Sequence, residues 1–95
     1  MKLEWQNNPP KNQMTWHEAN EYAESLGDGW RLPTRGELCD AYDNKIKGFN
    51  KFWYWSSSTY AQGTLNAWFV HFVSGNVFYG GKTNYTYVRC VREVN

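Results

Sequence analysis

The chain is poor in cysteine. Its 95 residues include two, Cys39 and Cys90, which are too few for a disulfide-rich scaffold. A bond between them would close a long loop and stabilise the fold by about 4 kcal/mol in the chain-entropy model. Because the N-terminal sequence shows no export signal, we expect buried free thiols that pack as small apolar groups.

Long apolar runs are missing as well. Residues 1–6 lack the apolar segment of a signal peptide, and no stretch reaches the length of a membrane span. We therefore expect a soluble protein with no membrane partner, cytoplasmic or phage-associated, or secreted if the chain is cut from a longer protein. The length predicts one domain over residues 1–95.

Acidic residues are absent from residues 52–88. A hard cation such as calcium needs carboxylate oxygens, so this half of the chain offers it no site. The two histidines, His17 and His71, have no second ligand at metal-binding spacing. We interpret His71 as a packed or edge residue of a strand, and the sequence predicts neither a metal nor another cofactor.

The charges are divided unevenly along the chain. Residues 1–44 carry four Lys/Arg and eight Asp/Glu, a net charge of −4, whereas residues 45–95 carry six and one, a net charge of +5. The total of +1 gives no polyelectrolyte attraction, so nucleic acid is not an expected partner.

Local signals predict two helices in the first half. Thr15 with Glu18, and Thr34 with Glu37, have the spacing of helix capping boxes. Gly27 is expected to end the first helix. The expected helices span residues 15–26 and 35–43.

Alternating apolar residues predict the strands. The expected strands cover residues 3–5, 52–57, 66–74, 77–79 and 85–92. Residues 66–74 are apolar on both faces, which is typical of a central strand, and Gly80 and Gly81 are expected to break the strand before them. This order predicts an α+β fold with two helices packed on a small, mainly antiparallel sheet.

The segment of residues 29–38 carries the most specific motif. Trp30 and Leu32 point to one side and are expected to be buried, while Pro33 holds Leu32 extended ahead of the second helix. This Gly-Trp-Arg-Leu-Pro-Thr motif resembles a signature of the bacterial Lcl C-terminal (DUF1566) family. Two later segments, residues 54–58 and 88–92, fit the same family.

The resemblance covers about residues 14–92 and implies a C-type-lectin-like fold. Formylglycine-generating enzymes share this fold and the Arg-Leu-Pro-Thr motif, but their cysteine pair does not match Cys39 and Cys90, so the resemblance implies no activity. The calcium-binding triplets of sugar-binding lectins are absent.

Aromatic residues are abundant: the chain has six Trp, seven Tyr and five Phe. A small domain cannot bury them all, and exposed Tyr beside Asn, Ser and Thr resembles the composition of an antibody paratope. The residues expected to form a ligand surface lie at predicted loops and strand ends: Tyr60, Gln62, Asn66, Tyr79, Asn84 and Tyr85. The resemblance implies the same region, because lectin-like proteins commonly bind ligands there.

We interpret the chain as a non-catalytic module that binds a protein or carbohydrate ligand without calcium. The alternative is a small phage or mobile-element protein that docks on a host protein and inhibits it. A cysteine-based oxidase using Cys39 and Cys90 ranks last, because it needs a base that the sequence does not place beside either thiol.

Overall fold

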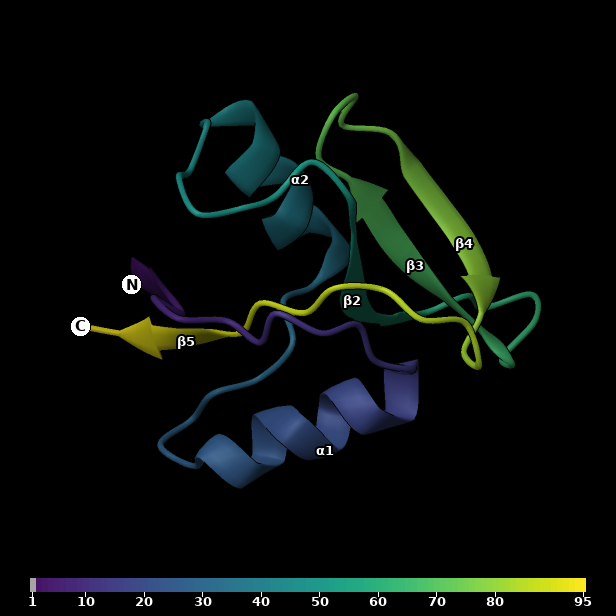
Figure 1. Cartoon of the computed structure of the whole chain (residues 1–95), viewed down its shortest axis with the longest axis horizontal. Helices are drawn as coiled ribbons and strands as arrows, with labels where there is room; N and C mark the ends of the chain where they lie inside the picture. Colours follow the sequence, from purple (N-terminus) through teal and green to yellow (C-terminus); the bar gives the residue numbers. More distant parts are fainter. Residues whose placement is uncertain (1) are drawn as a thin grey trace.

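The computed structural model describes residues 2–95, which fold into two helices and five strands (Figure 1). The elements are β1 (Lys2–Trp5), α1 (Trp16–Leu26), α2 (Arg35–Asp43), β2 (Trp53–Thr59), β3 (Asn66–His71), β4 (Val77–Gly81) and β5 (Val91–Val94). The α+β class, both helices and the first strand agree with the prediction. No helix within residues 2–95 is long and apolar enough to cross a membrane.

The strands form two antiparallel sheets. One pairs β1 with β5, so the two ends of the chain lie side by side (Figure 1). The other has the order β2-β3-β4, which makes β3 the central strand, as predicted. The outer edge of β2 is covered by a parallel bridge from Tyr54 to Tyr87.

Both helices begin at the expected capping boxes. Thr34 accepts a hydrogen bond from the Glu37 N–H at 3.1 Å, and Glu37 accepts one from the Thr34 N–H at 2.8 Å. Thr15 and Glu18 form the equivalent pair at α1. These local hydrogen bonds satisfy N–H groups that have no partner within the helix.

The core has two clusters, on opposite faces of the β2-β3-β4 sheet. Trp55 packs with Ala19 of α1, and its neighbour Tyr54 packs with Leu38 of α2. Successive residues of a strand point to opposite faces, so β2 contributes side chains to both clusters. Figure 1 accordingly shows α1 along the bottom of the molecule and α2 near the top.

The Gly-Trp-Arg-Leu-Pro-Thr segment connects α1 to α2, and thus the two faces of the sheet. Leu32 is buried, as predicted, but Trp30 is only half-buried. The guanidinium of Arg92 lies 4.8 Å from the centroid of the Trp30 ring. This cation shields the ring in place of a fully apolar environment.

Three strand predictions were wrong. The strand expected over residues 66–74 ends at His71, because residues 72–74 already form the turn toward β4. Gly80 and Gly81 do not break β4 but pair with Ala67 and Asn66 of β3. A Cβ on Gly80 would lie 3.4 Å from the Phe69 ring, so a glycine here accommodates a close neighbour within the strand. Residues 85–90 are not part of the last strand, because they make only isolated bridges before β5 begins.

The two cysteines are free. Cys90 is buried, as expected, whereas Cys39 of α2 is half-buried. Burial raises the pKa of the Cys90 thiol to about 12 and is also the main cause that raises the pKa of Cys39.

Candidate ligand-binding surface

Three aromatic residues form a cluster at one end of the β2-β3-β4 sheet. The rings of Tyr60 and Tyr79 are stacked, with centroids 3.8 Å apart and planes 5° from parallel. Trp68 packs edge-on against both, with centroids 5.3 Å from each. Because Tyr79 is 48% exposed, the cluster offers aromatic area to a ligand. We call Tyr60, Trp68, Tyr79 and the neighbouring Arg35 the tyrosine surface.

Strand register and one tight loop assemble this cluster. Trp68 and Tyr79 are paired directly across β3 and β4, so their side chains share a face. The loop after β2 is closed by backbone hydrogen bonds from the Tyr60 N–H to the Asn66 carbonyl and from the Asn66 N–H to the Gly63 carbonyl, both 2.9 Å. The Tyr60 hydroxyl donates to Gln62 at 2.9 Å. These bonds hold Tyr60 over Tyr79.

A cation extends the surface toward α2. The Arg35 guanidinium lies 4.4 Å from the Trp68 ring centroid, and its backbone N–H donates to the Ser58 hydroxyl at 3.2 Å. Arg35 forms no ion pair with any carboxylate of residues 2–95. The adjoining hollow measures about 490 Å³. It is lined by Arg35, Ser58, Thr59, Tyr60, Ala61, Gln62 and Trp68.

The two predicted asparagines lie beside this surface. A Cβ on Gly81 would be 3.9 Å from the Asn66 side-chain oxygen, and the Asn84 amide nitrogen would lie 3.5 and 3.8 Å from Cβ atoms on Gly80 and Gly81, at the end of β4. Gly81 is two residues after Tyr79 in β4, so the pleat places it on the same face. Tyr60, Asn66, Tyr79 and Asn84 therefore gather at one end of the sheet.

Tyr85 does not join them. It is 62% exposed and lines a separate hollow of about 600 Å³ beside α1, together with Glu18 and Glu21. Conversely, Arg35 and Trp68 were not among the predicted site residues. The strand alternation that placed Tyr79 also applies to Trp68, whereas no local signal connects Arg35 of α2 to β3.

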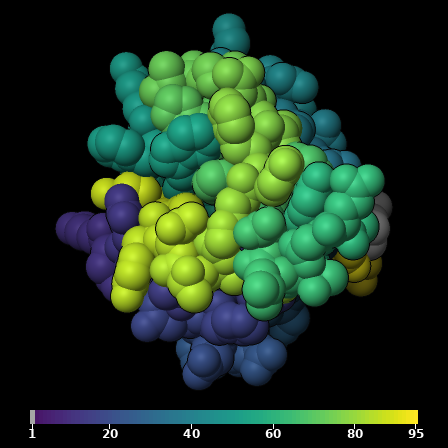
Figure 2. Space-filling model, turned by 90° about the vertical axis from the view of Figure 1, so that its right-hand side faces the viewer, coloured from purple at the N-terminus to yellow at the C-terminus, as the bar shows by residue number. Residues whose placement is uncertain are grey.

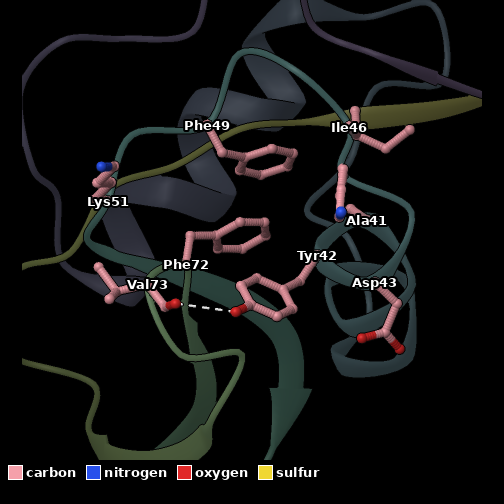
Figure 3. Close-up of a pocket in the computed structure, with 9 residues that line it drawn as sticks. Ala41, Tyr42, Asp43, Ile46, Phe49, Lys51, Phe72 and Val73 are labelled. Atoms are coloured by element: carbon pink, nitrogen blue, oxygen red, sulfur yellow. Dashed lines mark hydrogen bonds between the residues drawn. The ribbon is translucent and has the colours of Figure 1, made fainter.

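A third hollow, of about 470 Å³, lies between the end of α2 and the end of β3 (Figure 3). Phe49 and Phe72 are stacked at its centre, with centroids 4.0 Å apart. The Tyr42 hydroxyl donates to the Val73 carbonyl at 2.9 Å across it. Both phenylalanines pack on the core cluster of Leu38, so this hollow lies above the core. Its lining also includes the polar side chains of Tyr42, Asp43, Lys45 and Lys51.

The titratable residues are dispersed. His71 packs on Trp53, with ring centroids 4.2 Å apart, so of the two predicted alternatives it is a packed residue, in the central strand β3. Within residues 2–95, no group of three or more His, Cys, Asp or Glu side chains is arranged to hold a metal ion. The arrangement of the tyrosine surface is suited to contact and hydrogen bonding.

Comparisons with known proteins agree with this fold. The sequence matches the model of the Lcl C-terminal domain over residues 1–92. The structure resembles that of EMS16, described as an antagonist of the collagen receptor integrin α2β1, with a TM-score of 0.65 and 11% identity over 95% of this chain and 90% of that one. A search of curated proteins finds no significant match.

Proposed function

The chain belongs to the Lcl C-terminal domain family, and we propose that it is a non-catalytic module that binds a protein or carbohydrate ligand through the tyrosine surface without calcium. The observation that carries the proposal is the stacking of Tyr60 on Tyr79 beside an Arg35 that has no acidic partner within residues 2–95. The C-type-lectin-like fold supports binding only in general terms, because a fold does not determine function.

The chemistry of this surface suits recognition. Tyrosine and tryptophan supply large, rigid contact area at a low cost in conformational entropy, and hydroxyl and amide groups supply directional hydrogen bonds. Stacking restrains Tyr60 and Tyr79 before any ligand arrives, which reduces the entropy lost on binding. Ser58 and Gln62 line the same hollow and provide the polar groups.

The second candidate is a small phage or mobile-element protein that binds and inhibits a host protein. It is favoured by the described role of EMS16 as a receptor antagonist, since that protein has a similar fold. This alternative uses the same surface and differs in the ligand.

A cysteine-based oxidase is the weakest candidate. The nucleophile in such chemistry is a thiolate, and the burial that raises the pKa of Cys90 to about 12 disfavours its thiolate. Thiol titration of the native protein, together with metal analysis, tests this candidate directly.

The binding proposal is tested on a glycan array and by affinity purification from cells of the protein's own species. We expect the wild-type chain to capture a saccharide or a protein that the Tyr60→Ala/Tyr79→Ala variant does not capture. Tyr85→Ala is the matched control, because it removes an exposed tyrosine from a separate hollow. Binding that survives loss of both stacked tyrosines, in a variant with an unchanged circular dichroism spectrum, would show that the ligand lies elsewhere.

A further inference from the structure

Strand β4 is the open edge of its sheet. The strand order is β2-β3-β4, and the outer edge of β2 is occupied by the bridge to Tyr87. No strand of residues 2–95 pairs with the outer side of β4. Figure 1 shows this side facing outward at the right of the molecule, and Figure 2 turns it toward the viewer.

The register identifies which backbone groups face outward. The His71 N–H donates to the Asn76 carbonyl and the Lys82 N–H to the Leu65 carbonyl, both at 2.9 Å. Hydrogen-bonded pairs alternate along an antiparallel ladder, so even-numbered residues of β4 bond to β3. Val77, Tyr79 and Gly81 therefore direct their N–H and C=O groups away from β3. Of these groups, the Gly81 carbonyl accepts a bond from the Asn84 N–H at 3.0 Å.

This edge lacks the features that normally prevent strand pairing. Residues 77–81 read Val-Phe-Tyr-Gly-Gly, with no charge and no proline. Exposed edge strands are usually protected by lysine, proline, a bulge or a covering segment. Phe78 and Tyr79 are 43% and 48% exposed, so the two side chains at the middle of the strand are also accessible.

We propose that β4 pairs antiparallel with β4 of a second copy of this chain, with Tyr79 facing the partner's Tyr79. The outward residues are spaced symmetrically about Tyr79, so this register places Val77 opposite the partner's Gly81. Every outward N–H and C=O group of the two strands then has a partner, and the contact is closed by a two-fold axis. The two three-stranded sheets become one continuous sheet.

The second copy fits better than an unrelated strand because β4 is complementary to itself. It carries no charge that would meet a like charge in this register. Lys82, the cation that directly follows β4 in the sequence, is directed toward α1, with its ammonium 4.0 Å from the Trp16 ring centroid. The pairing also places two tyrosine surfaces on the same face of the joined sheet, so one dimer presents two adjacent binding surfaces for a multivalent ligand.

The first test is the molar mass of the wild-type chain by sedimentation and light scattering over a wide range of protein concentration. We expect the mass to rise to that of a dimer. A mass that stays monomeric up to the highest attainable concentration would overturn the proposal.

Proline substitution tests which strand makes the contact. Tyr79→Pro removes an N–H that points outward and leaves the ladder to β3 complete, because that N–H makes no bond to β3. We expect a folded monomer, whereas Tyr79→Phe, which keeps the N–H, remains dimeric. A folded Tyr79→Pro variant that still dimerises would place the interface elsewhere.

A charge pair tests the register and does not depend on the proline variant folding. Tyr79→Lys and Tyr79→Glu should each be monomeric, because like charges would face each other across the axis. When the two variants are mixed in equal amounts, native mass spectrometry should detect the Lys–Glu heterodimer at far more than twice the amount of either homodimer, which is the excess that random pairing alone produces. A heterodimer no more than twice as abundant as either homodimer, as random pairing gives, would show that position 79 does not face itself.

Discussion

Thr34 illustrates how a single side chain stabilises the start of α2. Its hydroxyl accepts the Glu37 N–H at 3.1 Å, and this is an N–H that the helix itself leaves unpaired. Thr34→Ala should therefore lower the free energy of unfolding by about 1 kcal/mol. Thr34→Ser, which keeps the hydroxyl, should change it little. A thermal midpoint that is equal in wild type and Thr34→Ala would contradict the cap.

Glu37 makes the free energy of unfolding depend on pH. It accepts two hydrogen bonds from Arg31, at 2.7 and 2.9 Å, and these are the largest cause that lowers its pKa below the usual 4.5. A carboxyl whose pKa is lowered by folding stabilises the protein above its unfolded pKa, and this stabilisation is lost as the pH falls through the folded value.

Glu37→Gln provides the measurement, because glutamine can still bond to the Thr34 N–H but carries no charge. The difference in melting temperature between wild type and Glu37→Gln should be constant above about pH 5 and shrink as the pH falls below the unfolded value near 4.5. A difference that grows on acidification would have the wrong sign for a lowered pKa.

At the scale of elements, the helices were predictable and the pairing of the last residues was not. A capping box is specified by residues three positions apart, so Thr15 and Thr34 identified both helix starts from local sequence. Residues 85–92 alternate as a strand does, but their partners are Met14, Arg31, Tyr54 and β1, which lie far away in the sequence. Alternation predicts an extended chain without identifying what it pairs with.

The candidate site was likewise predictable where it depends on local sequence, and not where it depends on contacts between distant elements. Alternation and turn residues led to Tyr60, Asn66, Tyr79 and Asn84, which the fold brings together. Tyr85 had the same signals, yet it follows the turn after β4 and lies beside α1. Arg35 was missed because its position beside Trp68 depends on how α2 packs against β3.

Arg89 connects the last part of the chain to the loop after α2. It is 6% exposed, and its guanidinium donates to the Gln6 carbonyl at 2.8 Å and to the Lys47 carbonyl at 2.7 Å. The same group lies 4.6 Å from the Phe49 ring centroid. Gly48 has a φ of +100°, and a Cβ there would come within 2.9 Å of Arg89. The loop is thus shaped around a buried cation.

Replacing this cation should loosen the loop. Arg89→Lys keeps the charge but cannot make both bonds in the fork geometry, so the free energy of unfolding should fall by about 2 kcal/mol, the value of one hydrogen bond to a charged group. Amide hydrogen exchange should accelerate in residues 44–51. Arg92→Lys is the control. Because the ion pair between Arg92 and Glu4 is partly exposed, this variant should lower the free energy of unfolding by less. Equal effects of the two variants would contradict the role of Arg89.

For the molecule as a whole, the distribution of acidic residues predicts indifference to calcium. Residues 52–88, which contribute β2, β3 and β4, contain no Asp or Glu. A ligand that binds only the folded state raises the melting temperature, so neither calcium nor EDTA should shift the melting curve. An upward shift with calcium would show a site built from the acidic first half and would overturn the calcium-independent proposal.

The same charge distribution separates two faces that a partner could use. Glu21 and Glu24 are exposed on α1, whereas the tyrosine surface lies at the other helix, beside Arg35. Central aromatic residues dominate the binding energy of interfaces. Tyr60→Ala should therefore make the binding free energy of the captured ligand less favourable by at least about 2 kcal/mol. Charges outside an interface act mainly on association rate and salt dependence.

Reversing the helix charges therefore distinguishes the two faces. Glu21→Lys/Glu24→Lys leaves Glu18 in its capping box and should alter the association rate and its salt dependence while the dissociation rate stays unchanged. Surface plasmon resonance at several salt concentrations measures both rates, with circular dichroism as the check on folding. If the helix variant abolished binding while Tyr60→Ala retained it, the ligand would bind the acidic half, where Tyr85 lies beside α1. The stacked tyrosines would then have only a structural role.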